Sequence, residues 1–253
     1  MHFYDASYPT ANKAVLRPPD ATVADYRNLQ AELGMARLVV VQPTTYGLDN
    51  RCQIEAMAAF GDCARGVMVV GADVDPSELA RLTDLGVRGA RFHMLPGGSV
   101  GWDVLDHVAA RVASVGWHIQ LQMNGHEFND RLDQLRRLPA DLVVDHIGRF
   151  MPPGGVGDPS FDALLDRLGD GRTWVKLSAP YESSPAHDAV LPYVDELVRR
   201  YPDRLLWATN WPHPGQVAPP SPSVLAELCL RWLPTEALRR QVMVDNPATL
   251  YDF

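Results

Sequence analysis

The most telling stretch of the chain is Leu205-Leu206-Trp207-Ala208-Thr209-Asn210-Trp211-Pro212-His213-Pro214, where an apolar run changes abruptly to polar and aromatic residues. This change predicts a buried strand that ends in a polar loop. In a barrel of alternating strands and helices, the loops at the carboxyl ends of the strands carry the chemistry. Asn210 stands where a carboxylate would suit proton transfer or metal binding, and an amide does neither at neutral pH.

Upstream of this stretch, helical and strand patterns alternate along the chain. A helix is expected to begin near Val23, with Thr22 or Asp20 as its cap, and to end at Gly34. The β-branched run Leu38–Val41 follows it, as is typical of a strand buried on both faces. The same cycle predicts further strands over residues 66–70, 87–92, 117–122, 142–145, 173–177 and 205–207.

With residues 1–4 as a first strand, the pattern amounts to about eight strand–helix units. It predicts an α/β fold in which residues 1–253 form a single domain, a (β/α)8 TIM-like barrel. An open doubly wound sheet is the alternative, and it is disfavoured because no glycine-rich phosphate turn follows the first strand. Because residues 1–4 already have the pattern of a strand interior, we expect the numbered chain to begin a few residues late.

Composition and charge narrow the class of protein. The 253 residues are 46% hydrophobic and 21% charged, which is ordinary for a folded soluble enzyme. A formal charge of −8 offers no basic stripe to nucleic acid or to an anionic membrane surface. Three scattered cysteines, no secretory leader and no long apolar run predict a cytoplasmic protein with reduced thiols. The oligomeric state stays open.

Polar side chains at the predicted strand ends form the candidate site. Arg91 lies between Ala90 and Phe92, so its guanidinium must be buried and paired, or must await an anionic ligand. His93 could belong to the site, but we favour an ordinary loop histidine whose hydrogen bonds are satisfied. The full set is His2, Gln42, Arg91, His93, Gln120, Gln122, Asn124, Asp145, His146, Lys176, Ser178, Asn210 and His213.

Alternation along the strands predicts which of these side chains enter the barrel. In the pair Asp145-His146 we expect His146 to point inward and Asp145 to orient backbone or a neighbouring loop. Lys176 either faces inward, with a function or a carboxylate partner, or points to the helix layer and reaches solvent. Four further histidines are interpreted as structural or surface residues without partners: His107, His118, His126 and His187.

The same residues bear on metal binding. A catalytic zinc takes three protein ligands and keeps one open position. His2 and His146 would supply two ligands, and the amide of Asn210 is a poor third. We therefore expect neither a metal nor another cofactor.

Several motifs together resemble the metal-independent branch of the amidohydrolase superfamily. They are Met1-His2-Phe3-Tyr4, Val144-Asp145-His146-Ile147-Gly148-Arg149-Phe150, Ala208-Thr209-Asn210-Trp211-Pro212-His213 and the closing Val244-Asp245-Asn246-Pro247-Ala248-Thr249-Leu250-Tyr251. The resemblance spans the whole chain. Within the branch, Leu95-Pro96-Gly97-Gly98-Ser99-Val100, Tyr181-Glu182-Ser183-Ser184 and Asn210 favour the lactone isomerases over the pyrone dicarboxylate lactonases, which have aspartate at the position of Asn210.

The resemblance implies a metal-independent enzyme that acts on a small, carboxylate-bearing sugar-acid lactone and converts a 1,5-lactone to a 1,4-lactone. Lactone hydrolysis is the second interpretation. A zinc-dependent amidohydrolase or decarboxylase and a non-catalytic binding barrel are disfavoured. The expected catalytic residues are His146, Asn210, Arg91 and His2, with Arg91 and a histidine as hydrogen-bond donors to the oxyanion. The expected substrate-binding residues are Gln42, Gln122, Asn124, Lys176, Tyr181, Trp211 and His213.

Overall fold

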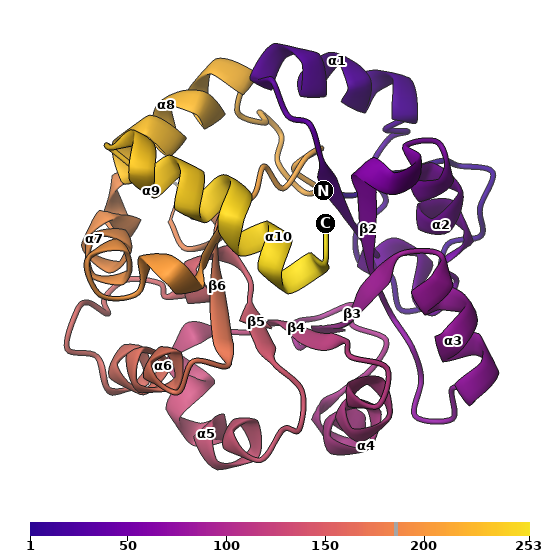
Figure 1. Cartoon of the computed structure of the whole chain (residues 1–253), viewed down its shortest axis with the longest axis horizontal. Helices are drawn as coiled ribbons and strands as arrows, with labels where there is room; N and C mark the ends of the chain where they lie inside the picture. The colour runs from indigo at the N-terminus through magenta and orange to yellow at the C-terminus, as the bar shows by residue number, and fades with distance from the viewer. Residues whose placement is uncertain (185–186) are drawn as a thin grey trace.

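The computed structural model describes residues 1–184 and 187–253. Its centre is a parallel sheet in which each strand pairs with the next strand along the chain, so that the sheet curls (Figure 1). A doubly wound sheet would reverse its strand order, and this order has no reversal. The seven strands are β1 (Leu38–Val41), β2 (Ala64–Met68), β3 (Val87–His93), β4 (His118–Gln122), β5 (Leu142–Val144), β6 (Thr173–Leu177) and β7 (Leu205–Trp207).

Residues 1–4, the predicted first strand, differ from this expectation. Among the described residues they form only one isolated bridge, between Tyr4 and Ala21. Their backbone nevertheless reaches both edges of the sheet. Val41 N–H, in β1, donates to Met1 O at 2.9 Å, and His2 N–H donates to Trp211 O, just after the last strand, at 2.8 Å. The parallel α/β architecture is thus confirmed, whereas a regular eighth strand is not formed.

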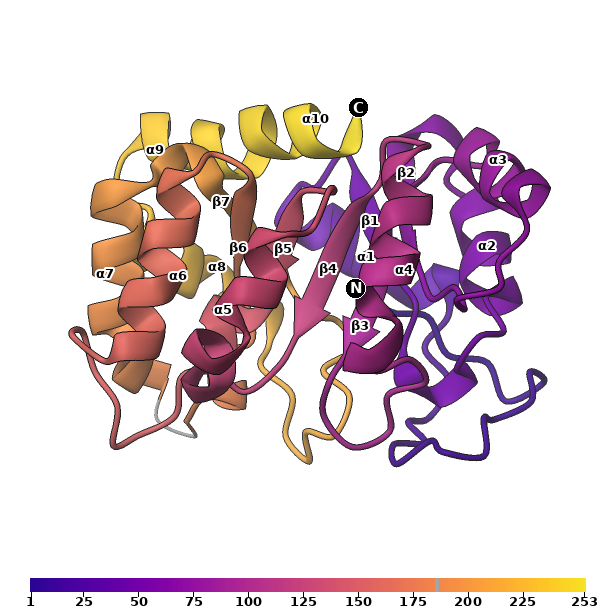
Figure 2. The ribbon, with the colours of Figure 1, turned by 90° about the horizontal axis from the view of Figure 1, so that it is seen from below.

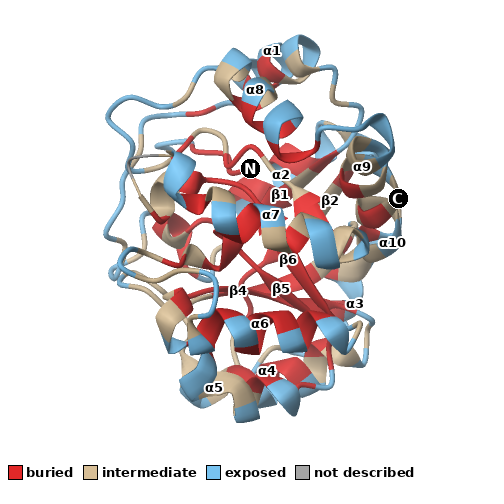
Figure 3. Ribbon diagram, turned by 90° about the vertical axis from the view of Figure 1, so that its left-hand side faces the viewer, coloured by how far each residue is buried: buried red, intermediate tan, exposed pale blue. Residues whose placement is uncertain are grey.

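Helices surround the curled sheet and put their apolar faces against it (Figures 1 and 3). The first begins after Thr22, whose side chain accepts a hydrogen bond from Asp25 N–H, and ends at Gly34 with φ of +66°. The helices are α1 (Val23–Leu33), α2 (Arg51–Ala58), α3 (Pro76–Asp84), α4 (Trp102–Ala113), α5 (Phe128–Arg136), α6 (Pro159–Gly169), α7 (Leu191–Arg200), α8 (Pro222–Trp232), α9 (Glu236–Arg240) and α10 (Asn246–Tyr251). None of the described helices is both long enough and apolar enough to cross a bilayer.

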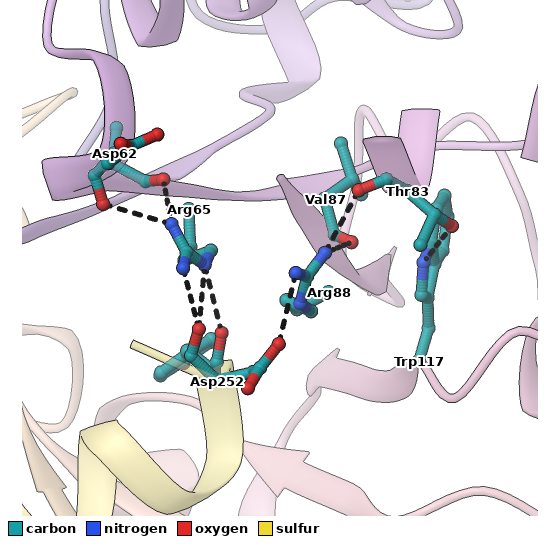
Figure 4. A network of polar contacts seen from close by, with 9 residues as sticks. Asp62, Arg65, Thr83, Val87, Arg88, Trp117 and Asp252 are labelled. Atoms are coloured by element: carbon teal, nitrogen blue, oxygen red, sulfur yellow. Dashed lines mark hydrogen bonds and ion pairs between the residues drawn. The ribbon is translucent and has the colours of Figure 1, made fainter. Parts of the chain in front are cut away.

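The last helix covers the end of the sheet where the strands begin (Figure 2). Arg65, at the start of β2, donates to Asp252 O at 2.6 Å, and Arg88, at the start of β3, forms an ion pair with Asp252 Oδ2 at 3.2 Å (Figure 4). This clasp fixes the carboxyl terminus at one end of the sheet, and the polar residues expected at the site lie at the other end.

Candidate active site

A small cavity at the carboxyl ends of the strands brings together residues from seven parts of the chain. Val41 belongs to β1, Arg91 to β3, Gln120 to β4 and Lys176 to β6. The four residues expected to be catalytic (His2, Arg91, His146 and Asn210) all line this cavity. Each of them is at least nine-tenths buried. The other lining residues are Met1, Asp145, Ser178 and Ala208.

An ion pair lies at the floor of the cavity. Lys176 Nζ lies 3.2 Å from Asp145 Oδ1 and donates to Gln120 Oε1 at 2.6 Å, while Gln120 Nε2 donates to Asp145 Oδ2 at 3.0 Å. Burial alone would raise the pKa of Asp145, but the charges of Lys176, His146 and Arg91 hold it below its usual range. Lys176 therefore faces inward with a carboxylate partner. The expectation that Asp145 orients backbone or a loop is wrong, because its carboxylate binds these two side chains.

His2 is held in one tautomer by the backbone. Its Nδ1 lies 2.7 Å from Val41 O, and a carbonyl only accepts, so Nδ1 carries the hydrogen and Nε2 keeps a lone pair. Burial and the charge of Arg91 keep the pKa of His2 well below its ordinary value. His2 is thus a neutral acceptor at neutral pH, rather than the oxyanion donor that the sequence suggested as one possibility.

His146 begins an unusual backbone turn. The φ angles of His146, Ile147, Gly148 and Arg149 are +55°, +57°, +77° and +53°, so four successive residues after β5 are left-handed. Left-handed backbone is costly for residues other than glycine, and such strain is concentrated at functional sites. His146 Nδ1 lies 2.9 Å from Ser178 Oγ, and burial lowers the pKa of His146 while Asp145 opposes that effect.

Arg91 is a cation of the cavity wall, and among the described residues its hydrogen bonds go to amide oxygens rather than to a carboxylate. It donates from Nη1 to Gln42 O at 2.6 Å and from Nη2 to Gln122 Oε1 at 2.9 Å. Its buried Nε has no hydrogen-bond partner among the described residues. The described residues thus satisfy both terminal nitrogens of this guanidinium and leave the buried Nε–H unpaired.

Asn210 follows β7 in a left-handed conformation, with φ of +59°. Its Nδ2 donates to Tyr181 Oη at 2.9 Å, and that hydroxyl lies 2.8 Å from His213 Nδ1. Tyr181 thus contacts the amide that lines the cavity, and the His213 ring contacts Tyr181. They are not among the residues that line the cavity itself.

The other residues expected to bind substrate have mainly supporting contacts. Gln42 Nε2 holds the following loop through Gly47 O at 3.0 Å and Asp49 O at 2.9 Å. Gln122 Oε1 accepts the hydrogen bond from Arg91. The Trp211 ring packs against Tyr26, with the ring centroids 5.3 Å apart.

Asn124 accepts a hydrogen bond from Arg149 Nη1, and Arg149 Nε lies 3.4 Å from Glu182 Oε2. Sequence reasoning missed Arg149 as a residue of this region. Its position three residues after His146 in the same motif is the signal that could have found it. Three residues that line the cavity, Gln120, Asp145 and Ser178, were candidates by position but had no expected role in catalysis or binding.

The histidines outside the site have more contacts than expected. His126 Nε2 lies 2.6 Å from Met151 O, and His107 Nε2 accepts from Arg111 at 3.1 Å, so neither lacks a partner. His118 is a buried residue of β4, and His93 Nδ1 lies 3.1 Å from Gln122 Oε1. His187 begins a short helical turn, His187–Val190.

Two further features concern ligands. Within residues 1–184 and 187–253, no group of three or more histidine, cysteine, aspartate or glutamate side chains is arranged to hold a metal ion. A cavity of about 480 Å³ lies beside β1, β7 and α10, and it shares Met1, Val41, Lys176 and Ala208 with the small cavity. Its lining is mainly apolar, so the polar cluster at the carboxyl ends of the strands is the better candidate for catalysis.

Comparisons with known proteins agree with the motifs. The family model described as amidohydrolase matches residues 1–253. A D-galactarolactone isomerase of Agrobacterium fabrum is 34% identical, over 99% of this chain and 89% of the relative. A 2-pyrone-4,6-dicarboxylate hydrolase of Comamonas testosteroni is also 34% identical, over 96% of this chain and 85% of the relative. An apo crystal structure from Agrobacterium tumefaciens, 32% identical, matches with a TM-score of 0.93 over 100% of this chain and 93% of that one.

Proposed function

The chain belongs to the amidohydrolase family and is an enzyme of its lactone-transforming kind, and from this premise we propose that it isomerises a sugar-acid lactone from a six-membered to a five-membered ring. The observation that carries the proposal is Asn210, an uncharged amide, in the cavity where hydrolysis would need a base for water. The substrate we propose is galactaro-1,5-lactone and the product is the 1,4-lactone.

The reaction exchanges one ester oxygen for another within the same molecule. The hydroxyl on carbon 4 attacks the acyl carbon, the bond from that carbon to the ring oxygen breaks, and one proton moves from the attacking to the released oxygen. No water is consumed. Such an internal attack depends mainly on alignment, and alignment alone can remove several kcal/mol from the reaction barrier.

Each buried group has a role in this exchange. His146, neutral because burial lowers its pKa, accepts the proton of the attacking hydroxyl and returns it to the released oxygen. Arg91, which lines the cavity, supplies positive charge that stabilises the negative charge developing on the carbonyl oxygen. His2 accepts a substrate hydroxyl at Nε2, and Asn210 aligns the attacking hydroxyl.

Several broader features belong to the same proposal. Residues 1–4, hydrogen-bonded to β1 and to the segment after β7, would complete a barrel around the substrate. We propose that the enzyme works in the cytoplasm, without a metal, on a lactone that carries a carboxylate.

Hydrolysis is the second candidate, because one relative with 34% identity is named a hydrolase. His146 would then have to activate water. The ionised Asp145 does not take this role readily, since Lys176 and Gln120 occupy its oxygens.

The test follows galactaro-1,5-lactone by proton NMR with a chelator present, against a sample without enzyme that records spontaneous conversion. We expect enzyme-dependent formation of the 1,4-lactone, and we expect His146→Gln to lower the rate at least about 100-fold. The exposed His107→Gln on α4 serves as the matched control and should retain full activity. Accumulation of the open-chain dicarboxylate instead of the 1,4-lactone would assign hydrolysis.

A further inference from the structure

Three side chains form a hydrogen-bonded series that leads outward from the cavity wall: Asn210, Tyr181 and His213. Tyr181, in the turn Pro180–Glu182 after β6, touches both Asn210 and His213 of the loop after β7. Two separate loops thus meet at one phenol oxygen. The contact distances are 2.9 Å from Asn210 Nδ2 and 2.8 Å from His213 Nδ1.

The two hydrogen bonds of this series point the same way, with Asn210 donating to Tyr181 and Tyr181 donating to His213. An amide nitrogen only donates, so the Tyr181 oxygen accepts from Asn210. Burial raises the pKa of Tyr181, which keeps its hydroxyl protonated, and lowers the pKa of His213 to about 4, which leaves the imidazole neutral at pH 7. A neutral imidazole accepts at one nitrogen, and Nδ1 is the one within reach of the tyrosine hydroxyl.

The consequence concerns the other end of the amide. With Nδ2 held by Tyr181, Asn210 Oδ1 has no hydrogen-bond partner in the described part of the chain, and Asn210 lines the cavity. If the amide turned over, Oδ1 would face the tyrosine and the NH₂ group would be left for the ligand. The two orientations recognise opposite groups, an O–H donor or an oxygen acceptor.

We propose that Tyr181 and His213 are positioning residues that fix the amide of Asn210 with its oxygen toward the ligand, and so select lactones with a hydroxyl that can attack the acyl carbon. This inference rests on the proposed function for the identity of the reaction. It adds a requirement that the family relationship does not supply: a hydroxyl donor on the substrate. A planar pyrone dicarboxylate, which has no such hydroxyl, is expected to be a poor substrate.

The orientation can be tested without any substrate. In protein labelled with ¹⁵N-asparagine, the side-chain signals of Asn210 are assigned by their loss in Asn210→Ala. We expect Tyr181→Phe to shift these signals, with the two amide protons becoming more alike. The control Tyr201→Phe, at the end of α7, should leave them unchanged. Asn210 signals that are indifferent to Tyr181→Phe would overturn the proposal, whatever the enzyme's activity.

Kinetics then test the role in the reaction. We expect Tyr181→Phe and His213→Leu each to lower kcat about tenfold with little change in KM, as loss of one aligned hydrogen bond implies. His213→Asn places an amide oxygen near the position of Nδ1 and should recover most of the rate. Equal losses in His213→Asn and His213→Leu, or losses confined to KM, would contradict a positioning role. Absence of lactone turnover in the unmodified enzyme would instead refute the proposed function and leave the NMR result standing.

Discussion

At the scale of single residues, the chemistry depends on the charge of the group at position 210. An amide can align a hydroxyl, but it cannot take a proton from water at neutral pH. A carboxylate at the same place could act as a general base. The other residues that line the cavity include the cations Lys176 and Arg91, so a negative charge at position 210 would have opposite charges close by.

We therefore predict that Asn210→Asp gains hydrolysis. Formation of the open-chain dicarboxylate should rise at least about tenfold while formation of the 1,4-lactone declines, because water now competes with the internal hydroxyl. Proton NMR of the product mixture measures both. The exposed Asn129→Asp on α5 is the charge-matched control. An unchanged product ratio in Asn210→Asp would show that position 210 does not govern the fate of the lactone.

At the scale of elements, the turn after β5 is the most constrained segment near the cavity. Gly148 has φ of +77°, and a Cβ built there would lie 2.5 Å from a ring carbon of Phe150. Backbone strain and overlap thus coincide at this residue. Gly116, after α4, has φ of +76° but no heavy atom within 4 Å of the same position.

These two glycines separate strain from overlap. We predict that Gly148→Ala lowers the free energy of unfolding by about 2–4 kcal/mol, from left-handed strain plus overpacking. Gly116→Ala should cost only the strain, about 1 kcal/mol. Urea unfolding followed by circular dichroism measures both. Similar losses in the two variants would mean that Phe150 moves aside at no cost.

The elements also show what the sequence could and could not predict. Strands such as Leu38–Val41 and Thr173–Leu177 were predictable because short, largely apolar runs between helical patterns are typical of buried parallel strands. The left-handed turn at 146–149 was not, because only one of its four residues is glycine. The contacts of Tyr181 with Asn210 and His213 join two loops, and spacing along the chain carries no signal for such a meeting.

The candidate cavity was predicted better than the roles of its residues. His2, Arg91, His146 and Asn210 do gather at one place, because the carboxyl ends of parallel strands share one end of the sheet. Which group donates and which accepts in each hydrogen bond could not be predicted from the sequence. His2, for example, accepts at Nε2 only because Val41 O occupies its other nitrogen.

At the scale of the whole molecule, buried neutral histidines link stability to pH. Burial lowers the pKa of His93 and His118 to about 3 and that of His213 to about 4. In the unfolded chain their pKa is about 6.5. Below that pH the unfolded chain binds protons that the folded protein does not, so stability falls as the pH drops from about 6.5 toward about 4.

His118 offers a test at a residue that does not line the cavity, since it is a buried histidine of β4 whose ring packs against Tyr251. We predict that His118→Leu reduces the loss of unfolding free energy between pH 8 and pH 5 by about 2 kcal/mol. Thermal and urea unfolding across this range provide the measurement. The control His107→Gln, at an exposed position, should lose as much unfolding free energy between pH 8 and pH 5 as the unmodified protein. An equal loss in His118→Leu would show that His118 does not contribute to this pH dependence.

The clasp between Asp252 and the two arginines has a practical consequence for handling the enzyme. It holds α10 over the end of the sheet where the strands begin, whereas the polar cluster lies at the other end, among the loops that follow the strands. A support attached through the outer surface of α9 and α10 should therefore leave turnover intact. Immobilisation through the loops after β6 and β7 would obstruct the face at which that cluster opens.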